Sequence, residues 1–335
     1  MRILDSIGSL QAPYTSTVLT IGNFDGVHLG HQALIKQIVE RAKLQKIPSV
    51  VMIFDPHPVK VLYPDRHLSR IFPLEDQVQQ FEKLGVEVLV VEPFSREFSQ
   101  LPPERYLQEW ILRPFSPETL VVGHDFSFGA NRGGSIDFLK SQSAALGFRL
   151  EVVGPVKVAD TLVSSSRIRK ALLAGEVELA ASLLGRFFYV EGLVVKGAGR
   201  GRQLGLPTAN LKLHGDFETA PALGVYAAWA SVRGKRRMAA VNIGKNPTFN
   251  EVGHLPPTIE AHVLDFPLPP KSAAESAAES AAESTDLYGE NLRLDFVARL
   301  RSEQKFSSKE KLIEQIHRDI QECRIAIGKS RDEMG

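Results

Sequence analysis

Hydrophobic residues follow two different patterns in the two halves of this 335-residue chain. Up to about residue 184, short continuous apolar runs alternate with helical spacing. Continuous runs are typical of parallel strands that helices cover on both faces, so we expect an α/β domain with a parallel sheet. The runs predict strands at residues 18–22, 49–54, 86–91, 119–122 and 150–153.

From residue 224 onward, apolar and polar residues alternate, which predicts an antiparallel barrel or sandwich. The expected strands are residues 224–232, 238–243, 258–266 and 292–300, with turns at 233–234 and 246–247. One face of the last strand is predicted to comprise Leu292, Leu294, Phe296, Ala298 and Leu300. The change of pattern places a domain boundary near residues 185–186.

A helix is predicted to close the chain. Ser307 with Glu310 three residues later has the form of a capping box, and Gly328 predicts the end of the helix. Its apolar stripe comprises Leu312, Ile313, Ile316, Ile320 and Cys323.

One segment fits neither pattern, because Ser-Ala-Ala-Glu occurs three times in tandem at residues 272–283. Its glutamates place like charges four residues apart, and it has no apolar face. We interpret residues 269–284 as a low-complexity insert that forms a mobile surface loop.

Composition narrows the class of protein. A net charge of +1, with 43% hydrophobic and 24% charged residues, is typical of a soluble globular chain and gives no sign of a nucleic-acid surface. No apolar run approaches the roughly 18 residues of a membrane span, so we expect a cytoplasmic protein without a membrane partner. Cys323 is the single cysteine, which excludes an intramolecular disulfide. The sequence leaves self-association open.

The motif at residues 22–31, GNFDGVHLGH, joins a predicted strand to a predicted helix. The helix amino end attracts anions, and the three glycines of the motif let a ligand approach the backbone closely. His28 and His31, three residues apart, therefore predict a phosphate site. By their spacing alone, the two imidazoles are more typical of structural or solvated histidines than of a phosphate site.

Three further stretches follow predicted strands: FDPHP at 54–58, GHDFSFG at 123–129 and SSSRIR at 164–169. Ligands of open parallel sheets bind beyond these carboxyl ends. Singly, the stretches are typical of a turn, of core aromatics and of helix caps.

Jointly and in this order, the four stretches resemble the Rossmann-like adenylyltransferase module of bacterial bifunctional riboflavin kinase/FAD synthetases, over about residues 14–184. The resemblance implies that the FMN phosphate attacks the α-phosphorus of ATP and pyrophosphate leaves. It implies catalytic roles for His28, His31 and Arg169. It also implies ATP contacts from Gly22, Phe24, Asp25, Gly26, Gly30, Ser165 and Ser166, and flavin contacts from Phe54, His57, Tyr106, Asp125 and Phe128.

The second half holds GAGRGR at 197–202, which is no dinucleotide fingerprint, because Pro207 prevents the helix that such a motif must open. A phosphate-covering loop fits better. It is followed by PTAN at 207–210, which alone is typical of a turn but offers the oxygen ligands that Mg²⁺ prefers.

With VNIGKNPTF at 241–249, IEAHVLDF at 259–266 and DLYG at 286–289, these motifs resemble the riboflavin kinase module of the same enzymes, over about residues 186–328. The resemblance implies a six-stranded antiparallel barrel that transfers the γ-phosphate of ATP to the ribityl hydroxyl of riboflavin. Glu260 would be the base, Thr208 and Asn210 the Mg²⁺ ligands, and Gly197, Gly199, Gly201 and Arg202 the ATP loop.

Taken together, the motifs predict an enzyme that converts riboflavin to FMN and then to FAD, with riboflavin, FMN and ATP as its small-molecule substrates. Two alternatives remain at this stage. One is an FAD synthetase with a flavin-sensing barrel, and the other is a non-catalytic flavin carrier.

Overall fold

The computed structural model describes residues 1–66, 68–197, 206–215, 217, 219–245, 257–266 and 287–333, with side chains up to residue 329. The predicted turn at 246–247 and the predicted insert at 269–284 lie outside these residues. The chain divides into two compact units, Met1–Ser165 and Ser166–Gly335. Among the described residues, no helix combines the length and apolar character needed to cross a membrane.

The first unit is built on a six-stranded sheet in which all neighbouring strands pair in parallel, in the order β1-β4-β3-β2-β5-β6. The predicted parallel sheet is therefore confirmed, and the five predicted strands begin and end within two residues of the observed ones. The strands are β1 (Arg2–Leu4), β2 (Thr17–Ile21), β3 (Ser49–Asp55), β4 (Val88–Pro93), β5 (Pro117–Gly123) and β6 (Arg149–Val153). The edge strand β1 was not predicted, because three residues are too few to carry a pattern.

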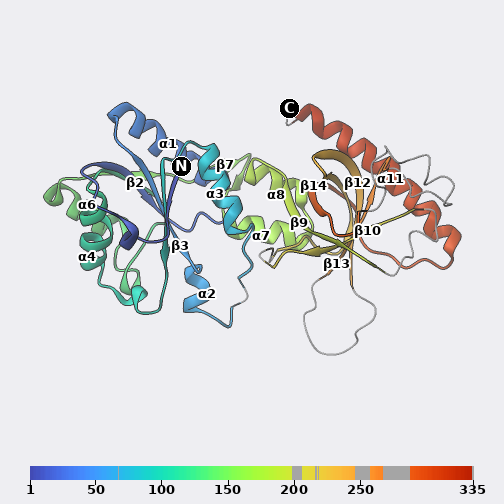
Figure 1. The fold of residues 1–335 in the computed structure, drawn as a ribbon, viewed down its shortest axis with the longest axis horizontal. Helices are drawn as coiled ribbons and strands as arrows, with labels where there is room; N and C mark the ends of the chain where they lie inside the picture. The colour runs from blue at the N-terminus through green and yellow to red at the C-terminus, as the bar shows by residue number, and fades with distance from the viewer. Residues whose placement is uncertain are drawn as a thin grey trace. The chain divides into compact units, whose positions relative to one another are not determined.

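Helices cover both faces of this sheet (Figure 1). One face carries α1 (Leu29–Gln45) and α3 (Leu74–Lys83). The other carries α4 (Pro103–Tyr106), the π-helical turn η3 (Leu107–Leu112), α5 (Arg113–Phe115) and α6 (Ile136–Leu146). The remaining elements are α2 (Pro58–Leu62), the hairpin of β7 (Lys157–Val158) and β8 (Thr161–Leu162), and the 3-10 turns η1 (Ile7–Ser9), η2 (Phe98–Gln100) and η4 (Ala130–Arg132).

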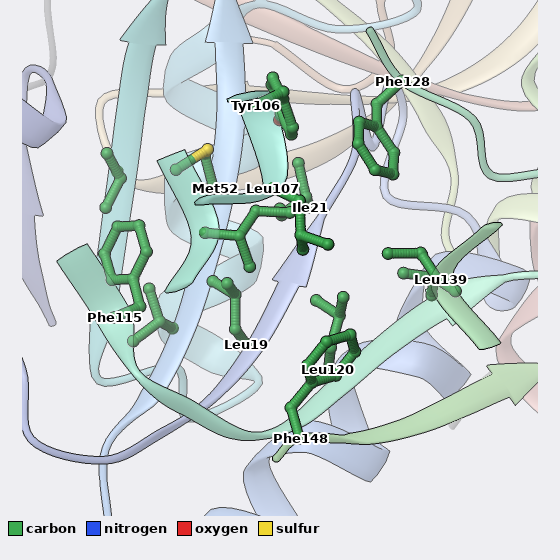
Figure 2. Close-up of a cluster of buried hydrophobic side chains, with 14 of the residues drawn as sticks. Leu19, Ile21, Met52, Tyr106, Leu107, Phe115, Leu120, Phe128, Leu139 and Phe148 are labelled. Atoms are coloured by element: carbon green, nitrogen blue, oxygen red, sulfur yellow. The ribbon is translucent and has the colours of Figure 1, made fainter. Parts of the chain in front are cut away.

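Successive residues of the central strands point into two separate cores. Val18 and Val51 pack with α1 and α3, whereas Leu19 and Met52 pack with the opposite layer, which Figure 2 shows. Because both faces are buried, every position of these strands favours an apolar side chain. This explains why their hydrophobicity is continuous.

The second unit begins with α7 (Ser165–Ala174) and α8 (Val177–Leu184), followed by a closed antiparallel barrel in the order β10-β13-β12-β11-β14-β9. The predicted six-stranded antiparallel barrel is confirmed. Its strands are β9 (Phe188–Val195), β10 (Ala209–Leu213), β11 (Gly224–Val232), β12 (Lys235–Gly244), β13 (Thr258–Val263) and β14 (Asn291–Arg301). Alternation located the last four strands, but β9 and β10 were not singled out.

Arg299 fastens α7 and α8 to the barrel. Its guanidinium donates to the backbone oxygens of Ala174 and Leu223, at 3.0 and 2.9 Å, and its backbone N–H donates to Glu178 at 3.1 Å. Both helices therefore belong to the same compact unit as the barrel, and the boundary between the two units falls at Ser165. The domain limits inferred from the sequence, 14–184 and 186–328, stay a prediction.

The prediction for the faces of β14 was wrong in its second half. Leu292, Leu294 and Phe296 are fully buried. A bulge then leaves Val297 without a partner on β11, since Ala227 pairs with Ala298 and Ala228 with Phe296. The extra residue reverses the alternation. As a result, Val297, Ala298 and Leu300 all pack in the cluster beneath the last helix, together with Ala227, Trp229, Leu264, Cys323 and Ile327.

That last helix, α11 (Lys309–Glu333), lies along β11, β12 and β14 (Figure 1). Both predicted ends were wrong. Ser308 caps it, because its hydroxyl accepts from the N–H of Lys311 at 3.4 Å, and Gly328 keeps a helical backbone within it. Cys323 is buried as predicted, whereas the rest of the predicted stripe, Leu312, Ile313, Ile316 and Ile320, is only half-buried.

Candidate active sites

The first candidate site is the loop between β2 and α1. Its backbone is unusual, because Phe24 (φ 49°) and Val27 (φ 38°) adopt a left-handed conformation although neither is glycine. For a β-branched residue such as Val27 this conformation is rare and costs about 1–3 kcal/mol, and such strain gathers at functional sites. The packing around the loop must therefore hold it in place.

Two glycines make this packing possible. A Cβ at Gly22 would lie 3.0 Å from the ring of Phe24, and a Cβ at Gly26 (φ 81°) would lie 2.9 Å from Ile71. Without these side chains, the buried ring of Phe24 packs edge-on against Phe81, with ring centroids 5.8 Å apart. The absence of side chains at Gly22 and Gly26 thus allows the loop to pack closely against α3 and the segment before it.

Asp25 ties the loop to two distant segments. Its side chain is buried, and its Oδ1 accepts from the N–H of Ile71 at 3.1 Å. Its backbone oxygen accepts from the hydroxyl of Ser165 at 2.9 Å. Two residues that the sequence assigned to ATP, Asp25 and Ser165, are therefore brought together, but each already has a structural partner.

The two motif histidines stack at the start of α1, with ring centroids 3.5 Å apart and planes at 16°. Nδ1 of His28 accepts from the N–H of His31 at 3.3 Å, so the hydrogen of the neutral His28 ring lies on Nε2. Gly30 allows this arrangement, because a Cβ there would lie 3.2 Å from the ring of His28. The sequence prediction that these rings share the helix amino end agrees with this geometry.

Burial, and secondarily the charge of His28, hold the pKa of His31 well below its usual range. Nδ1 of His31 is buried and has no hydrogen-bond partner among the described residues. The imidazole pair and the N–H groups that begin α1 can donate hydrogen bonds to a phosphate. Such a pair stabilises negative charge that grows during a reaction.

Ser166 and Arg169 lie on α7, where Ser166 is exposed and Arg169 is half-buried. Both fall in the second unit, whereas the histidines fall in the first. Their joint action on one nucleotide stays a prediction.

The second candidate site of the first unit is an aromatic cluster beyond the ends of β3 and β4. It contains three residues that were predicted to contact flavin, namely Phe54, Tyr106 and Phe128. Phe54 and Tyr106 each pack against Phe98, and Phe128 packs against Tyr106. Ring centroids are 5.6 Å apart for Phe54 and Phe98, 5.6 Å for Phe98 and Tyr106, and 4.8 Å for Tyr106 and Phe128. Figure 2 shows Tyr106 and Phe128 close together. Sequence reasoning missed Phe98, which lies in a short 3-10 turn with no distinctive pattern.

The remaining predicted flavin residues differ in their surroundings. His57 is buried and caps α2, since its Nδ1 accepts from the N–H of Val59 at 3.2 Å. Asp125 is exposed at the end of β5. Their contact with a flavin stays a prediction.

A buried carboxyl group lies beside the aromatic cluster and was also missed. Glu92 accepts from the N–H of Ile7 at 2.7 Å and from the indole of Trp110 at 3.4 Å. Burial raises the pKa of Glu92, and burial with the charge of Glu92 raises the pKa of Tyr106. The Tyr106 hydroxyl is buried without a hydrogen-bond partner among the described residues. The hydrogen-bonding capacity of this hydroxyl is therefore not satisfied by the apolar side chains around it.

In the second unit, three polar residues lie side by side across three strands. Glu260 on β13 is directly opposite Asn210 on β10 and Asn242 on β12. Opposite residues of an antiparallel pair share a face. Asn242 points to the same side of β12 as Ala240, two residues before it. Ala240 is paired with Ala227 of β11, which packs in the cluster beneath α11. Asn210, Glu260 and Asn242 therefore lie on the outer face of the barrel.

Asn242 was not among the predicted site residues. Alternation in the VNIG motif could have found it, because Val241 and Ile243 are buried on the other face. Gly197 was predicted, and it lies against Asn210: a Cβ at Gly197 would come within 2.1 Å of Asn210 Nδ2. Thr208 is half-buried just before β10. Gly199, Gly201 and Arg202 lie outside the described residues.

Comparison with known proteins adds to this geometry. Residues 10–167 match the family model of FAD synthetase, and residues 184–327 match that of riboflavin kinase. The chain is 36% identical to the bifunctional riboflavin kinase/FMN adenylyltransferase of Bacillus subtilis, over 92% of this chain and 91% of that protein. It is 33% identical to the Escherichia coli (strain K12) protein of the same name, over 95% and 96%.

Among solved structures, a crystal structure described as a macrolide-efflux protein from Streptococcus pneumoniae matches with a TM-score of 0.81. The two chains are 29% identical, and the match covers 96% of this chain and 98% of that one. The likeness therefore extends over both units.

Proposed function

The chain belongs to the family of bifunctional riboflavin kinase/FMN adenylyltransferases, and from this premise we propose how its residues share the two reactions. The protein is a riboflavin kinase and a nucleotidyltransferase, with riboflavin, FMN and ATP as substrates. The FAD synthetase match covers strands β2 to β6 of the sheet in the first unit, and the riboflavin kinase match covers the barrel of the second. The two sites therefore use different residues.

In the first unit, a phosphate oxygen of FMN bonds to the α-phosphorus of ATP while the bond to the β-phosphate breaks and pyrophosphate leaves. Both reactants are anions, so the site must position them and offset their charge. We assign this role to His28, through Nε2–H, to His31, and to the N–H groups that begin α1. Ser166 and Arg169 would hold the β- and γ-phosphates.

The flavin ring of FMN needs flat apolar walls and a few polar contacts. Phe54, Tyr106 and Phe128 would form such walls. Flavin binding there would have to open the cluster around the buried Tyr106 hydroxyl, which would then supply a polar contact. Phe98 supports Phe54 and Tyr106, because its ring lies 5.6 Å from each of theirs, and Tyr106 in turn packs against Phe128.

In the barrel, the primary hydroxyl of riboflavin loses its proton to Glu260 as its oxygen bonds to the γ-phosphorus of ATP and ADP leaves. A primary alcohol is a poor nucleophile at neutral pH, so a carboxylate within hydrogen-bond reach is required. Glu260 is half-buried on the outer face between two asparagines, where a substrate can reach it.

The kinase site also fits Mg²⁺. Thr208 and Asn210 offer the hard hydroxyl and amide oxygens that this ion prefers, beside the carboxylate of Glu260. The described residues hold no cluster of three or more His, Cys, Asp or Glu that could bind a metal alone. A few protein oxygens and the nucleotide phosphates would together complete the shell. Bound there, Mg²⁺ would offset negative charge on the phosphates.

The observation that carries the proposal is the row Asn210, Glu260 and Asn242 on a barrel separate from the stacked histidines. Incubation of the purified protein with riboflavin, Mg²⁺ and ATP tests it. Sequential appearance of FMN and FAD is the expected result. FAD formed only from added FMN would support an adenylyltransferase with a sensing barrel, and bound but unreacted riboflavin would support a carrier.

The cytoplasm is our proposal for where the enzyme works, because its single cysteine does not need an oxidising compartment. Fractionation of cells, with the protein followed by antibody, tests this assignment.

A further inference from the structure

His262 makes a contact that the two reactions do not explain. It lies on β13 two residues after Glu260, and its Nδ1 is 2.8 Å from the backbone oxygen of Pro207. A carbonyl oxygen only accepts, so Nδ1 of His262 carries the hydrogen and donates it. The hydrogen bond joins residues 55 apart in the sequence.

Pro207 lies outside the ladder of backbone hydrogen bonds. The ladder of β10 with β13 begins at Ala209, opposite Ala261, and proline has no N–H with which to extend it. Continuing the register by one residue would bring Thr208 opposite His262, just as Asn210 is opposite Glu260. The turn that carries Thr208 therefore precedes the ladder, and the side chain of His262 reaches it.

Gly197 restrains the same region from the other side. It lies so close to Asn210 that a Cβ would come within 2.1 Å of Nδ2. Asn210 is thus fixed by the ladder and by the backbone beside it, whereas Thr208 depends on the conformation of the turn.

We propose that His262 is a positioning residue of the kinase site, which holds the Pro207 carbonyl so that Thr208 and Asn210 present their oxygens to one nucleotide-bound divalent cation. The inference rests on the proposed function of the barrel and adds a residue to it. If the turn is already ordered in the free enzyme, nucleotide binding does not have to order it. Less conformational entropy is then lost on binding, so the affinity is higher.

The test compares three variants in the full-length protein. His262→Ala removes the donor, and His262→Asn restores one, because the amide Nδ2 of asparagine occupies about the position of Nδ1. His214→Ala is the matched control, since His214 follows the far end of β10 and makes its own hydrogen bond to Asn291 at 3.0 Å. Calorimetry measures binding of ADP with Mg²⁺ and with EDTA.

We expect His262→Ala to weaken binding of Mg²⁺-ADP about 3- to 10-fold, the range for one lost hydrogen bond. Binding of ADP in EDTA should change less, and the KM for Mg²⁺-ATP should rise more than kcat falls. His262→Asn should bind Mg²⁺-ADP like the wild type, as should His214→Ala. Formation of FAD from added FMN by the same samples checks that each variant is folded.

Wild-type binding of Mg²⁺-ADP by His262→Ala would overturn the proposal. So would equal weakening in Mg²⁺ and in EDTA, or a His262→Asn variant as impaired as His262→Ala. The variants Thr208→Ala and Asn210→Ala test the proposed metal site itself, independently of His262. If neither of these two variants weakens Mg²⁺-ADP binding, the proposed metal site fails, and the role of His262 fails with it.

Discussion

Replacing Tyr106 with phenylalanine should stabilise the enzyme while impairing FMN adenylylation. The variant keeps the ring that packs 5.6 Å from Phe98 and 4.8 Å from Phe128. It removes a hydroxyl that is buried without a partner among the described residues. A buried unsatisfied polar group costs about 1–3 kcal/mol, so its removal should raise the free energy of unfolding by about that amount.

Differential scanning calorimetry measures this change. A gain of 1 kcal/mol in a unit of this size corresponds to a rise in Tm of roughly 2–4 °C. Tyr226→Phe is the matched control in the barrel, because the buried Tyr226 donates its hydroxyl hydrogen to the Ala222 oxygen. Loss of that bond should lower the free energy of unfolding by about 0.5–1.5 kcal/mol.

The two variants should therefore shift stability in opposite directions. In the same Tyr106→Phe protein, the KM for FMN should rise by about 2- to 10-fold, because a hydrogen bond to the flavin is lost. A lower Tm for Tyr106→Phe would refute the reasoning, since it would mean that the hydroxyl is satisfied in the free enzyme. An unchanged KM would refute its contact with the flavin.

Four further predictions concern the two sites. His28→Ala should slow FAD formation from FMN about 10²- to 10³-fold, with FMN formation from riboflavin as the internal control; a full rate would contradict its role. Glu260→Gln should slow FMN formation about 10²- to 10⁴-fold and leave FAD formation unchanged, and unaltered turnover would exclude it as the base. Gly197→Ala should raise the KM for Mg²⁺-ATP, because its Cβ would displace Asn210; an unchanged KM would show that Asn210 is not held there. As the pH falls below about 6.5, protons bind His31 in the unfolded chain before the folded one, so stability should fall by up to about 1.4 kcal/mol per pH unit. His31→Phe should flatten this slope in denaturant unfolding, and an equal slope would contradict the lowered pKa.

Local patterns predicted most of the architecture. The continuous run around Val18 and Leu19 predicted a strand buried on both faces, and the motif around His28 and His31 predicted the strand-to-helix corner. In these cases the signal and the structure lie within the same few residues. The unpredicted reversal at Val297 depends on how β14 pairs with β11, which alternation along one strand does not encode.

The unpredicted parts of the sites depend on contacts between distant segments. Phe98 and Glu92 take part in the aromatic cluster only because β4, η2 and η3 converge there. The bond from His262 to Pro207 likewise needs the register of β13 with β10. Asn242 is different, because its alternation with buried neighbours was visible in the sequence and was not used.

The short strand β1 bears on how the first unit can be produced alone. Arg2, Ile3 and Leu4 pair with β4, opposite Val88, Leu89 and Val90. A fragment that starts at residue 14, as the sequence pattern suggests, would leave the backbone donors and acceptors of β4 open along the sheet edge. Open edges recruit strands from other chains, and a three-residue edge strand exposes fewer backbone groups than β4 would. A fragment that starts at residue 14 should therefore aggregate more readily than one that retains Arg2–Leu4.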